Sequence, residues 1–210
     1  MSINVNSFLS GHMKNLSYCI YDSVTKDCVI VDPTWDIDVV FQFVDDQNLT
    51  PREIWLTHSH YDHIQGLSSC EVRYPNVVVC IHEMEAARLD TGLSIIRLEH
   101  NSIRKLGDME WRVIHTPGHS PGGVCFYAAP YLICGDTLFV NGCGRADIPG
   151  ADVNALFLSL QELKGLPTST LIFPGHHYGR SESDTLASQL KKNKYLRTDD
   201  ELMFIKLRMG

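Results

Sequence analysis

The sequence predicts a layered α/β protein. Short apolar runs that are typical of strands alternate along the chain with amphipathic stretches that are typical of helices. Several of these apolar runs end in polar turns that contain glycine. At 210 residues, of which 44% are hydrophobic and 20% charged, the chain fits one globular domain with a sizeable core.

The first third of the chain alternates strands with one helix. The runs "NLSYCIYD" (15–22) and "CVIVDP" (28–33) are rich in β-branched and aromatic residues and predict two strands. Residues 36–47 predict a helix that Asp36 caps. Its apolar face consists of Val39, Val40, Phe43 and Val44. The run "EIWLTH" (53–58) predicts the next strand.

The same reasoning predicts the later elements. Apolar runs predict strands at "NVVVCI" (76–81), "MEWRVIHT" (109–116), "VCFYA" (124–128), "YLICGD" (131–136) and "TLIFPGH" (170–176). Helical periodicity predicts helices at 82–88, 152–163 and 183–193.

Composition argues against several classes of protein. A net charge of −7 disfavours the extended basic face that a general nucleic-acid binder needs. No run approaches the roughly 20 apolar residues of a membrane span, and the N-terminus "MSINVNSFLSGH" lacks the basic and apolar regions of a secretory signal. The seven cysteines are odd in number and form no CxxC pair. We therefore expect buried, reduced thiols in a cytoplasmic protein with no membrane or nucleic-acid partner.

Four of the strand-like runs lead into turns that carry candidate metal ligands. Leu56 leads into "THSHYDH", Ile114 into "HTPGHS", Cys134 into "GDTLF" and Phe173 into "PGHHYG". Loops at one edge of a rigid sheet are where functional groups are readily assembled. Histidine nitrogens and carboxylate oxygens together suit zinc, iron or manganese.

The spacing in "HSHYDH" predicts two neighbouring clusters. In an extended loop, side chains alternate, so His58 and His60 can bind one ion. If the chain then turns helical, Asp62 and His63 face a second ion. The distant loops would complete the sites, with His119 in the first cluster, His176 in the second and Asp136 bridging both. A water shared by two such ions would lose a proton near neutral pH and become a nucleophile. His177 is an alternative to His176 as the ligand.

These motifs resemble the metallo-β-lactamase superfamily. "THSHYDH" matches its HxHxDH signature, and "TPGHSPGG", "GDTLF" and "PGHHYG" follow in the family's order. The resemblance implies an αββα sandwich spanning residues 1–210, with a short C-terminal helical tail and a dinuclear site at one edge of the sheets. Zn²⁺ is the expected metal, with Fe or Mn as alternatives, and Asp62 and Asp136 are the expected catalytic carboxylates.

Part of the sequence resembles the glyoxalase II branch, whose members hydrolyse thioesters. The segment "GDTLFVNGCGR" carries this resemblance, and it implies that Arg145 lies near the substrate. His177 and Tyr178 follow the candidate ligand His176 directly and are further candidates for substrate contact. The opening "SGHMKNLSYCIYD" is more similar to stand-alone hydrolases of polyketide biosynthesis, which are thought to clear acyl chains from carrier proteins. The leading prediction is therefore hydrolysis of an acyl thioester on an acyl carrier protein. The basic tail, with Lys191, Lys192, Lys194, Arg197, Lys206 and Arg208, could meet such a partner.

Other functions stay open at this point. Glyoxalase II uses a substantial C-terminal helical region to bind glutathione, whereas the chain after His176 has room for one or two helices. Persulfide dioxygenases share the fold and a similar "GCGR" segment but use one iron and oxygen. True metallo-β-lactamases usually have cysteine in place of Asp136, which disfavours antibiotic hydrolysis. A non-catalytic binding module would not need the intact ligand set, and the acidic balance disfavours a nuclease.

Overall fold

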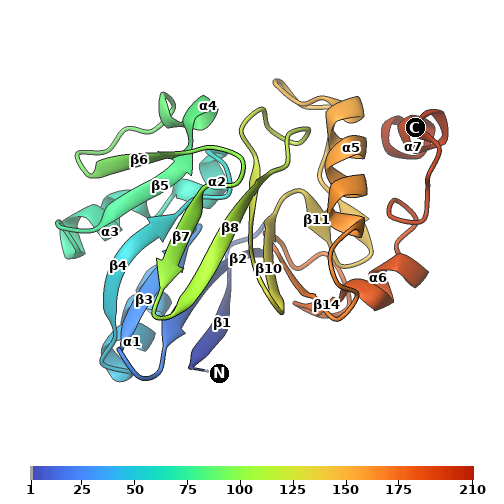
Figure 1. Cartoon of the computed structure of the whole chain (residues 1–210). Coiled ribbons are helices and arrows are strands. Elements are labelled where there is room, and N and C mark those ends of the chain that lie inside the picture. Colours follow the sequence, from blue (N-terminus) through green and yellow to red (C-terminus); the bar gives the residue numbers. More distant parts are fainter. Residues whose placement is uncertain (1) are drawn as a thin grey trace.

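Two sheets pack face to face between two layers of helices in the computed structural model, which describes residues 2–210 (Figure 1). The first sheet has the order β1-β2-β3-β4-β5-β6. Its strands are β1 (Ile3–Ser10), β2 (Asn15–Asp22), β3 (Asp27–Val31), β4 (Thr50–Trp55), β5 (Val78–His82) and β6 (Ser94–Leu98). The helices on its outer side are α1 (Asp38–Asp46), α2 (Tyr61–Ile64), α3 (Leu67–Arg73) and α4 (Glu83–Ala86).

The second sheet has the order β14-β13-β10-β9-β8-β7. Its strands are β7 (Ile103–Leu106), β8 (Met109–His115), β9 (Val124–Ala128), β10 (Tyr131–Gly135), β13 (Leu171–Pro174) and β14 (Asp184–Thr185). A small sheet joins β11 (Leu138–Phe139) to β12 (Gly142–Cys143). The helices α5 (Val153–Lys164), α6 (Leu186–Lys192) and α7 (Glu201–Met209) lie on the outer side. The predicted αββα sandwich is confirmed.

Alternation of side chains along the strands creates three apolar layers. In β3, Ile30 packs toward the helices of the first sheet, while its neighbours Val29 and Val31 pack between the sheets. In β10, Ile133 packs between the sheets, and Leu132 packs toward α5. Because both faces are buried, these strands are continuous apolar runs with no polar face. That is why the sequence predicted them so readily.

Strand direction brings the loops of interest to one edge. The strands β3, β4, β5 and β6 run parallel to one another. In the second sheet, β8, β10 and β13 also share one direction, because β9 is antiparallel to both β8 and β10, and β13 is parallel to β10. The carboxyl ends of parallel strands meet at the same edge of a sheet, so all four predicted ligand loops can converge.

Several elements differ from the sequence prediction. The helix α1 begins at Asp38 after Ile37, and the Asp36 carboxylate accepts a hydrogen bond from the Gly11 backbone (3.4 Å) instead of capping the helix. The third late helix, α6, begins at Leu186, because the two preceding residues pair with β13 as β14. The strands β1, β6 and β7 and the helix α3 were not predicted; β1, β6 and β7 are outer strands whose residues are only partly apolar.

The cysteines and the helix lengths agree with the composition. All seven cysteines are free thiols and are buried within the described residues 2–210. In that same range, no helix is both long enough and apolar enough to cross a membrane.

One buried histidine gives the fold a pH-dependent stability. His82 caps α4 by accepting a hydrogen bond from the Met84 backbone (3.3 Å), and its ring stacks on that of His115 at 4.1 Å. Burial, together with the neighbouring imidazole, lowers the pKa of His82 to about 4. The unfolded chain therefore binds a proton that the folded chain does not between about pH 6.5 and pH 4.

We expect the free energy of unfolding of the metal-free protein to fall through this window as the pH falls. The contribution of His82 should be about 1–2 kcal/mol after an allowance for solvent screening. Urea unfolding at several pH values would measure it. In His82→Asn, which keeps a capping acceptor, this part of the pH dependence should vanish; an unchanged pH profile would contradict the assignment.

Candidate metal centre

The first cluster consists of three histidines from two loops. His58 and His60 follow β4, and His119 follows β8. Their candidate ligand atoms all lie within 4.8 Å of one another. The His60 Nδ1 and His119 Nε2 atoms are 2.9 Å apart, so both lone pairs can point to a common position. This is the three-histidine set that the spacing predicted.

The second cluster lies beside the first. Asp62 and His63 are on the short helix α2, and His176 follows β13. The His176 Nε2 atom lies 3.2 Å from His63 Nε2 and 3.3 Å from Asp62 Oδ2. His60, directly before α2, still has an extended backbone (φ −64°, ψ 143°). The helix thus begins at the point where the side chains must change direction, as the sequence predicted.

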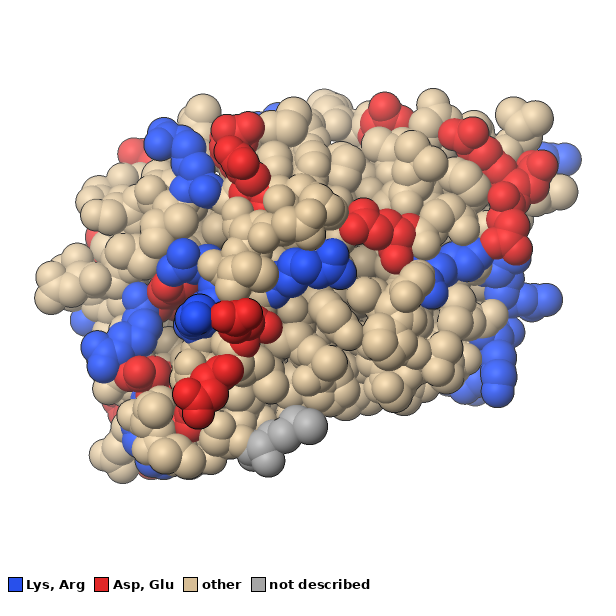
Figure 2. Space-filling view, in the orientation of Figure 1, with Lys and Arg blue, Asp and Glu red and all other residues tan. Residues whose placement is uncertain are grey.

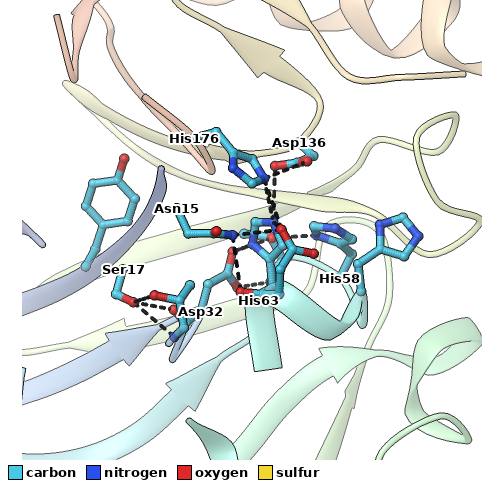
Figure 3. A network of polar contacts seen from close by, with 12 residues as sticks. Asn15, Ser17, Asp32, His58, His63, Asp136 and His176 are labelled. Atoms are coloured by element: carbon cyan, nitrogen blue, oxygen red, sulfur yellow. Dashed lines mark hydrogen bonds and ion pairs between the residues drawn. The ribbon is translucent and has the colours of Figure 1, made fainter. Parts of the chain in front are cut away.

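Asp136 lies between the two clusters. Its Oδ2 atom is 3.4 Å from His119 Nε2 and 3.3 Å from His176 Nε2, while its Oδ1 atom is 3.3 Å from His63 Nε2. Figure 3 shows Asp136 and His176 converging on His63. One carboxylate in contact with both histidine sets has the geometry of a bridge, so the structure brings together all seven side chains that the sequence nominated.

Outer hydrogen bonds set the direction in which the histidines point. The Nδ1 atoms of His119 and His176 donate to the backbone oxygens of Arg145 (3.0 Å) and Met13 (2.9 Å). Since each Nδ1 is engaged away from the cluster, each Nε2 faces into it. Such second partners fix the tautomer and orientation of metal-binding histidines.

Asp32 is an outer residue that the sequence analysis missed. The His63 Nδ1 atom donates to its Oδ2 (3.0 Å), and the Thr57 backbone donates to its Oδ1 (2.7 Å). The Thr57 hydroxyl also donates to Oδ2 (2.6 Å). With its oxygens occupied in this way, Asp32 serves to orient His63. The available signal was an acidic residue at the end of the buried run "CVIVD", at the same edge as the other loops.

Asn15 is a second missed residue. Its side-chain amide donates to Asp62 Oδ2 (2.8 Å) and to the Asp62 backbone oxygen (3.2 Å), and it accepts from the Trp35 indole (3.2 Å). It lies at the start of β2, which runs antiparallel to β3 and therefore begins at the edge where β3 ends. Asn15 thus holds the carboxylate of the second cluster in place.

A buried carboxylate joins the loops of the first cluster. Glu85 on α4 is inaccessible to solvent. Its carboxylate accepts hydrogen bonds from the Ser59 hydroxyl and from the Gly122 backbone (2.9 Å). Ser59 lies between His58 and His60, and Gly122 lies in the loop that carries His119. Glu85 therefore ties together the two loops that supply this cluster.

The polar atoms of the site fit bound metal. His58 Nε2 and Asp136 Oδ1 are buried, and neither has a hydrogen-bond partner among residues 2–210. Buried polar atoms nearly always have a hydrogen-bond partner, so two such atoms without one among the candidate ligands indicate a missing ligand. Histidine nitrogens and carboxylate oxygens are ligands for Zn²⁺, Fe and Mn.

The electrostatics of the two clusters differ. In the first, burial lowers the pKa of His60 to about 4 with help from the His119 ring, so its imidazole is neutral and available as a ligand. In the second, Asp136 and Asp62 outweigh the effect of burial and raise the pKa of His176 to about 9. The carboxylates therefore stabilise positive charge there, which is what a cation site requires.

A cavity of about 330 Å³ opens onto both clusters. Beyond the candidate ligands, its wall consists of apolar and aromatic side chains and one arginine: Met13, Phe139, Ile148, Tyr61, Tyr178 and Arg145. The Tyr178 ring stacks on that of His176 at 4.8 Å, and the Arg145 guanidinium pairs with Asp147. The structure thus places two of the three predicted substrate contacts on the cavity wall.

His177 does not line that cavity, and its contact with the substrate stays a prediction. Its backbone donates to the Lys14 oxygen (2.8 Å), and its side chain lies outside the cavity wall described above. Neighbouring side chains in an extended segment point to opposite sides, so when His176 faces the clusters His177 faces away. The alternative in which His177 replaces His176 as a ligand is thereby disfavoured.

The contact between Asn15 and Asp62 can be tested through metal binding. In Asn15→Ala, we expect the affinity of the second cluster for metal to fall about 10–100-fold, as for loss of other outer partners. Isothermal titration calorimetry of the metal-free protein with Zn²⁺ would resolve the two binding steps. Trp35→Phe removes the indole donor to Asn15 but leaves both contacts between Asn15 and Asp62, so it should have a smaller effect. Unchanged affinity in Asn15→Ala would contradict this role.

Comparisons with known proteins agree with this geometry. The sequence profile of the metallo-beta-lactamase superfamily matches residues 15–176. A Bacillus velezensis protein named probable polyketide biosynthesis zinc-dependent hydrolase BaeB is 31% identical over 199 residues, covering 92% of this chain and 87% of that protein. A hydroxyacylglutathione hydrolase of Serratia proteamaculans is 36% identical over 179 residues, covering 85% and 68%. The crystal structure of ETHE1 from Myxococcus xanthus has the same fold, with a TM-score of 0.88, 24% identity and coverage of 99% and 90%.

Proposed function

Because the chain belongs to the metallo-beta-lactamase superfamily, we propose that it is a metal-dependent hydrolase of acyl thioesters that removes acyl groups from an acyl carrier protein in polyketide biosynthesis. The observation that carries the proposal is the pair of complete ligand clusters joined by Asp136 beneath an apolar cavity. The names of the Bacillus and Serratia relatives support zinc, a polyketide pathway and a thioester substrate.

We assign two metal ions, most simply Zn²⁺, to the two clusters. His58, His60 and His119 would hold one ion, and Asp62, His63 and His176 the other, with Asp136 between them. Bound metal would supply Lewis acidity and a water of lowered pKa. Iron or manganese would suit the same mixture of nitrogen and oxygen ligands.

The residues of the chain then have distinct tasks. Asp62 and Asp136 act as ligands and as fixed negative charges, and the outer bonds to Met13, Arg145 and Asp32 keep the imidazoles directed inward. A fixed arrangement of this kind needs no reorganisation during the reaction. Thiolate is a good leaving group, so a separate strong acid is less necessary than in amide hydrolysis.

The cavity wall fits an acyl thioester. Met13, Phe139 and Ile148 offer apolar surface for an acyl chain, whereas Arg145 and the exposed Tyr178 bring polar groups to the same wall. Pockets that combine apolar walls with few polar groups typically bind small organic ligands in one orientation. The acyl chain would occupy the apolar side and the thiol carrier the polar side.

The proposal is tested by presenting one acyl group on three carriers: glutathione, coenzyme A and a phosphopantetheinylated carrier protein. Thiol release is followed with the zinc-loaded enzyme, and metal content is measured on the same sample. We expect two ions per chain and the highest kcat/KM for the carrier protein.

The other outcomes would each support a different function. A higher kcat/KM for the glutathione thioester would indicate a hydroxyacylglutathione hydrolase. No release from any carrier, together with one iron per chain and oxygen uptake with a persulfide substrate, would indicate an oxygenase and overturn the proposal.

A further inference from the structure

A second cavity adjoins the catalytic one. It has a volume of about 470 Å³ and shares Phe139, Arg145 and Tyr178 with the wall of the catalytic cavity. We call this second cavity the basic groove; its remaining wall includes Asn141, Cys143, Arg180, Lys194 and Tyr195. Because the two cavities share wall residues, an extended ligand can occupy both.

The basic groove concentrates positive charge in a protein whose net charge is −7. Its lining contains Arg145, Arg180 and Lys194 and no Asp or Glu among the described residues. The Arg145 guanidinium is already paired with Asp147 through two contacts of 3.0 Å. Arg180 and Lys194 are both exposed, so their charges are available to an incoming anion.

The chain around Lys194 is anchored to the catalytic side of the molecule. The buried Asn193 side chain donates to the backbone oxygens of Gly142 (2.9 Å) and Phe139 (3.3 Å). The Lys194 ammonium lies 4.9 Å from the centre of the Tyr195 ring, within the range of a cation–π contact. Lys194 is therefore held close to Phe139, which lines both cavities.

The backbone next to Arg180 is held at the same wall by close packing. A Cβ atom added to Gly179 would lie 2.7 Å from Val140 Cβ and 2.8 Å from the Val140 backbone oxygen. Only glycine allows this approach. The segment that carries Arg180 is thus pressed against Val140, another residue of the groove. In Figure 2, lysine and arginine side chains gather at the end of the molecule formed by α6 and α7, and Lys194 follows the C-cap residue of α6, Asn193.

We propose that the basic groove binds the phosphate of a phosphopantetheine arm through Arg180 and Lys194, while the thioester end of the arm reaches the metal clusters. Guanidinium and ammonium groups are the usual protein partners of phosphate. The arm is an extended chain with phosphate at one end and sulfur at the other, which matches two joined cavities of different polarity. This inference rests on the proposed thioesterase function and adds the group by which the carrier is recognised.

The test compares two substrates that differ only in the phosphate: one acyl group on phosphopantetheine and the same group on pantetheine. The variants are Arg180→Gln, Lys194→Gln and the double substitution. We expect kcat/KM of the double variant to fall about 10-fold on the phosphorylated substrate, mainly through KM, and to stay unchanged on pantetheine. Higher salt should narrow the wild-type preference for the phosphorylated substrate, because these charges are exposed.

A matched control comes from the other side of the fold. Arg97 is an exposed cation on β6, at the outer edge of the first sheet. Arg97→Gln removes the same charge and should leave both substrates unaffected. Equal losses on both substrates in the double variant, or no loss on either, would overturn the assignment of the groove.

Calorimetric binding of free phosphopantetheine separates this inference from the proposed function, because it needs no turnover. If the wild type binds phosphopantetheine more tightly than pantetheine, and the double variant does not, the groove is supported even where no thioester is hydrolysed. If the wild type hydrolyses thioesters but the double variant keeps the full preference for phosphate, the groove assignment alone fails. Parallel measurements of kcat/KM with acyl coenzyme A and acyl carrier protein then show which of the two phosphopantetheine carriers is preferred.

Discussion

Replacing Asp136 with alanine is expected to abolish thiol release and to lower the content of both metal ions. Its two oxygens lie 3.3–3.4 Å from Nε2 atoms of both clusters, so one substitution would remove the side chain that we assign to both ions. Loss of an outer partner alone costs about 10–100-fold in affinity or activity, and loss of a bridging ligand should cost more. Metal analysis together with kcat/KM would measure both effects.

The metal-free Asp136→Ala protein should stay folded, because the three apolar layers that hold the sheets and helices together are unchanged. Circular dichroism would show this and separate loss of the site from loss of the fold. His58→Ala should likewise abolish turnover, with metal lost first from the three-histidine cluster. Full activity in either variant would contradict the assigned ligands.

Replacing Gly175 with alanine is expected to disrupt the site although no ligand is changed. The added Cβ atom would lie 2.3 Å from Asp136 Oδ1 and 2.8 Å from His63 Cε1, well inside normal contact distance. It would also lie 3.1 Å from the Gly135 backbone, so the strand ends of β10 and β13 must separate or Asp136 must turn away. We expect metal binding and activity to fall at least about 100-fold, as for a direct disturbance of a ligand.

Gly142→Ala provides the matched control. An added Cβ atom there would lie 3.6 Å from the Phe139 side chain, which is an ordinary van der Waals distance. This variant should keep its metal. If Gly175→Ala behaved like Gly142→Ala, the close approach of the backbone to Asp136 would not matter for the site.

The sequence by itself determined the layers and nominated the seven candidate ligands. Strands such as β9 and β10 are buried on both faces, so their apolar composition is visible in the sequence without tertiary information. The spacing of His58, His60, Asp62 and His63 follows from local backbone geometry, namely an extended loop that turns into a helix. Edge strands such as β1 escaped prediction because their pairing with a neighbour, rather than their own apolar pattern, stabilises them.

Only the tertiary structure decided which residues support and surround those ligands. Asn15, Asp32 and Glu85 act on the clusters from the start of β2, the end of β3 and α4, at positions far along the sequence from the groups that they contact. The choice of His176 over His177 depends on which side of an extended segment faces the clusters, and adjacent residues do not reveal that side. Local spacing can fix the chemistry of a loop, because neighbouring side chains are joined by the backbone. Contacts between distant loops depend on strand order and direction, which the fold alone establishes.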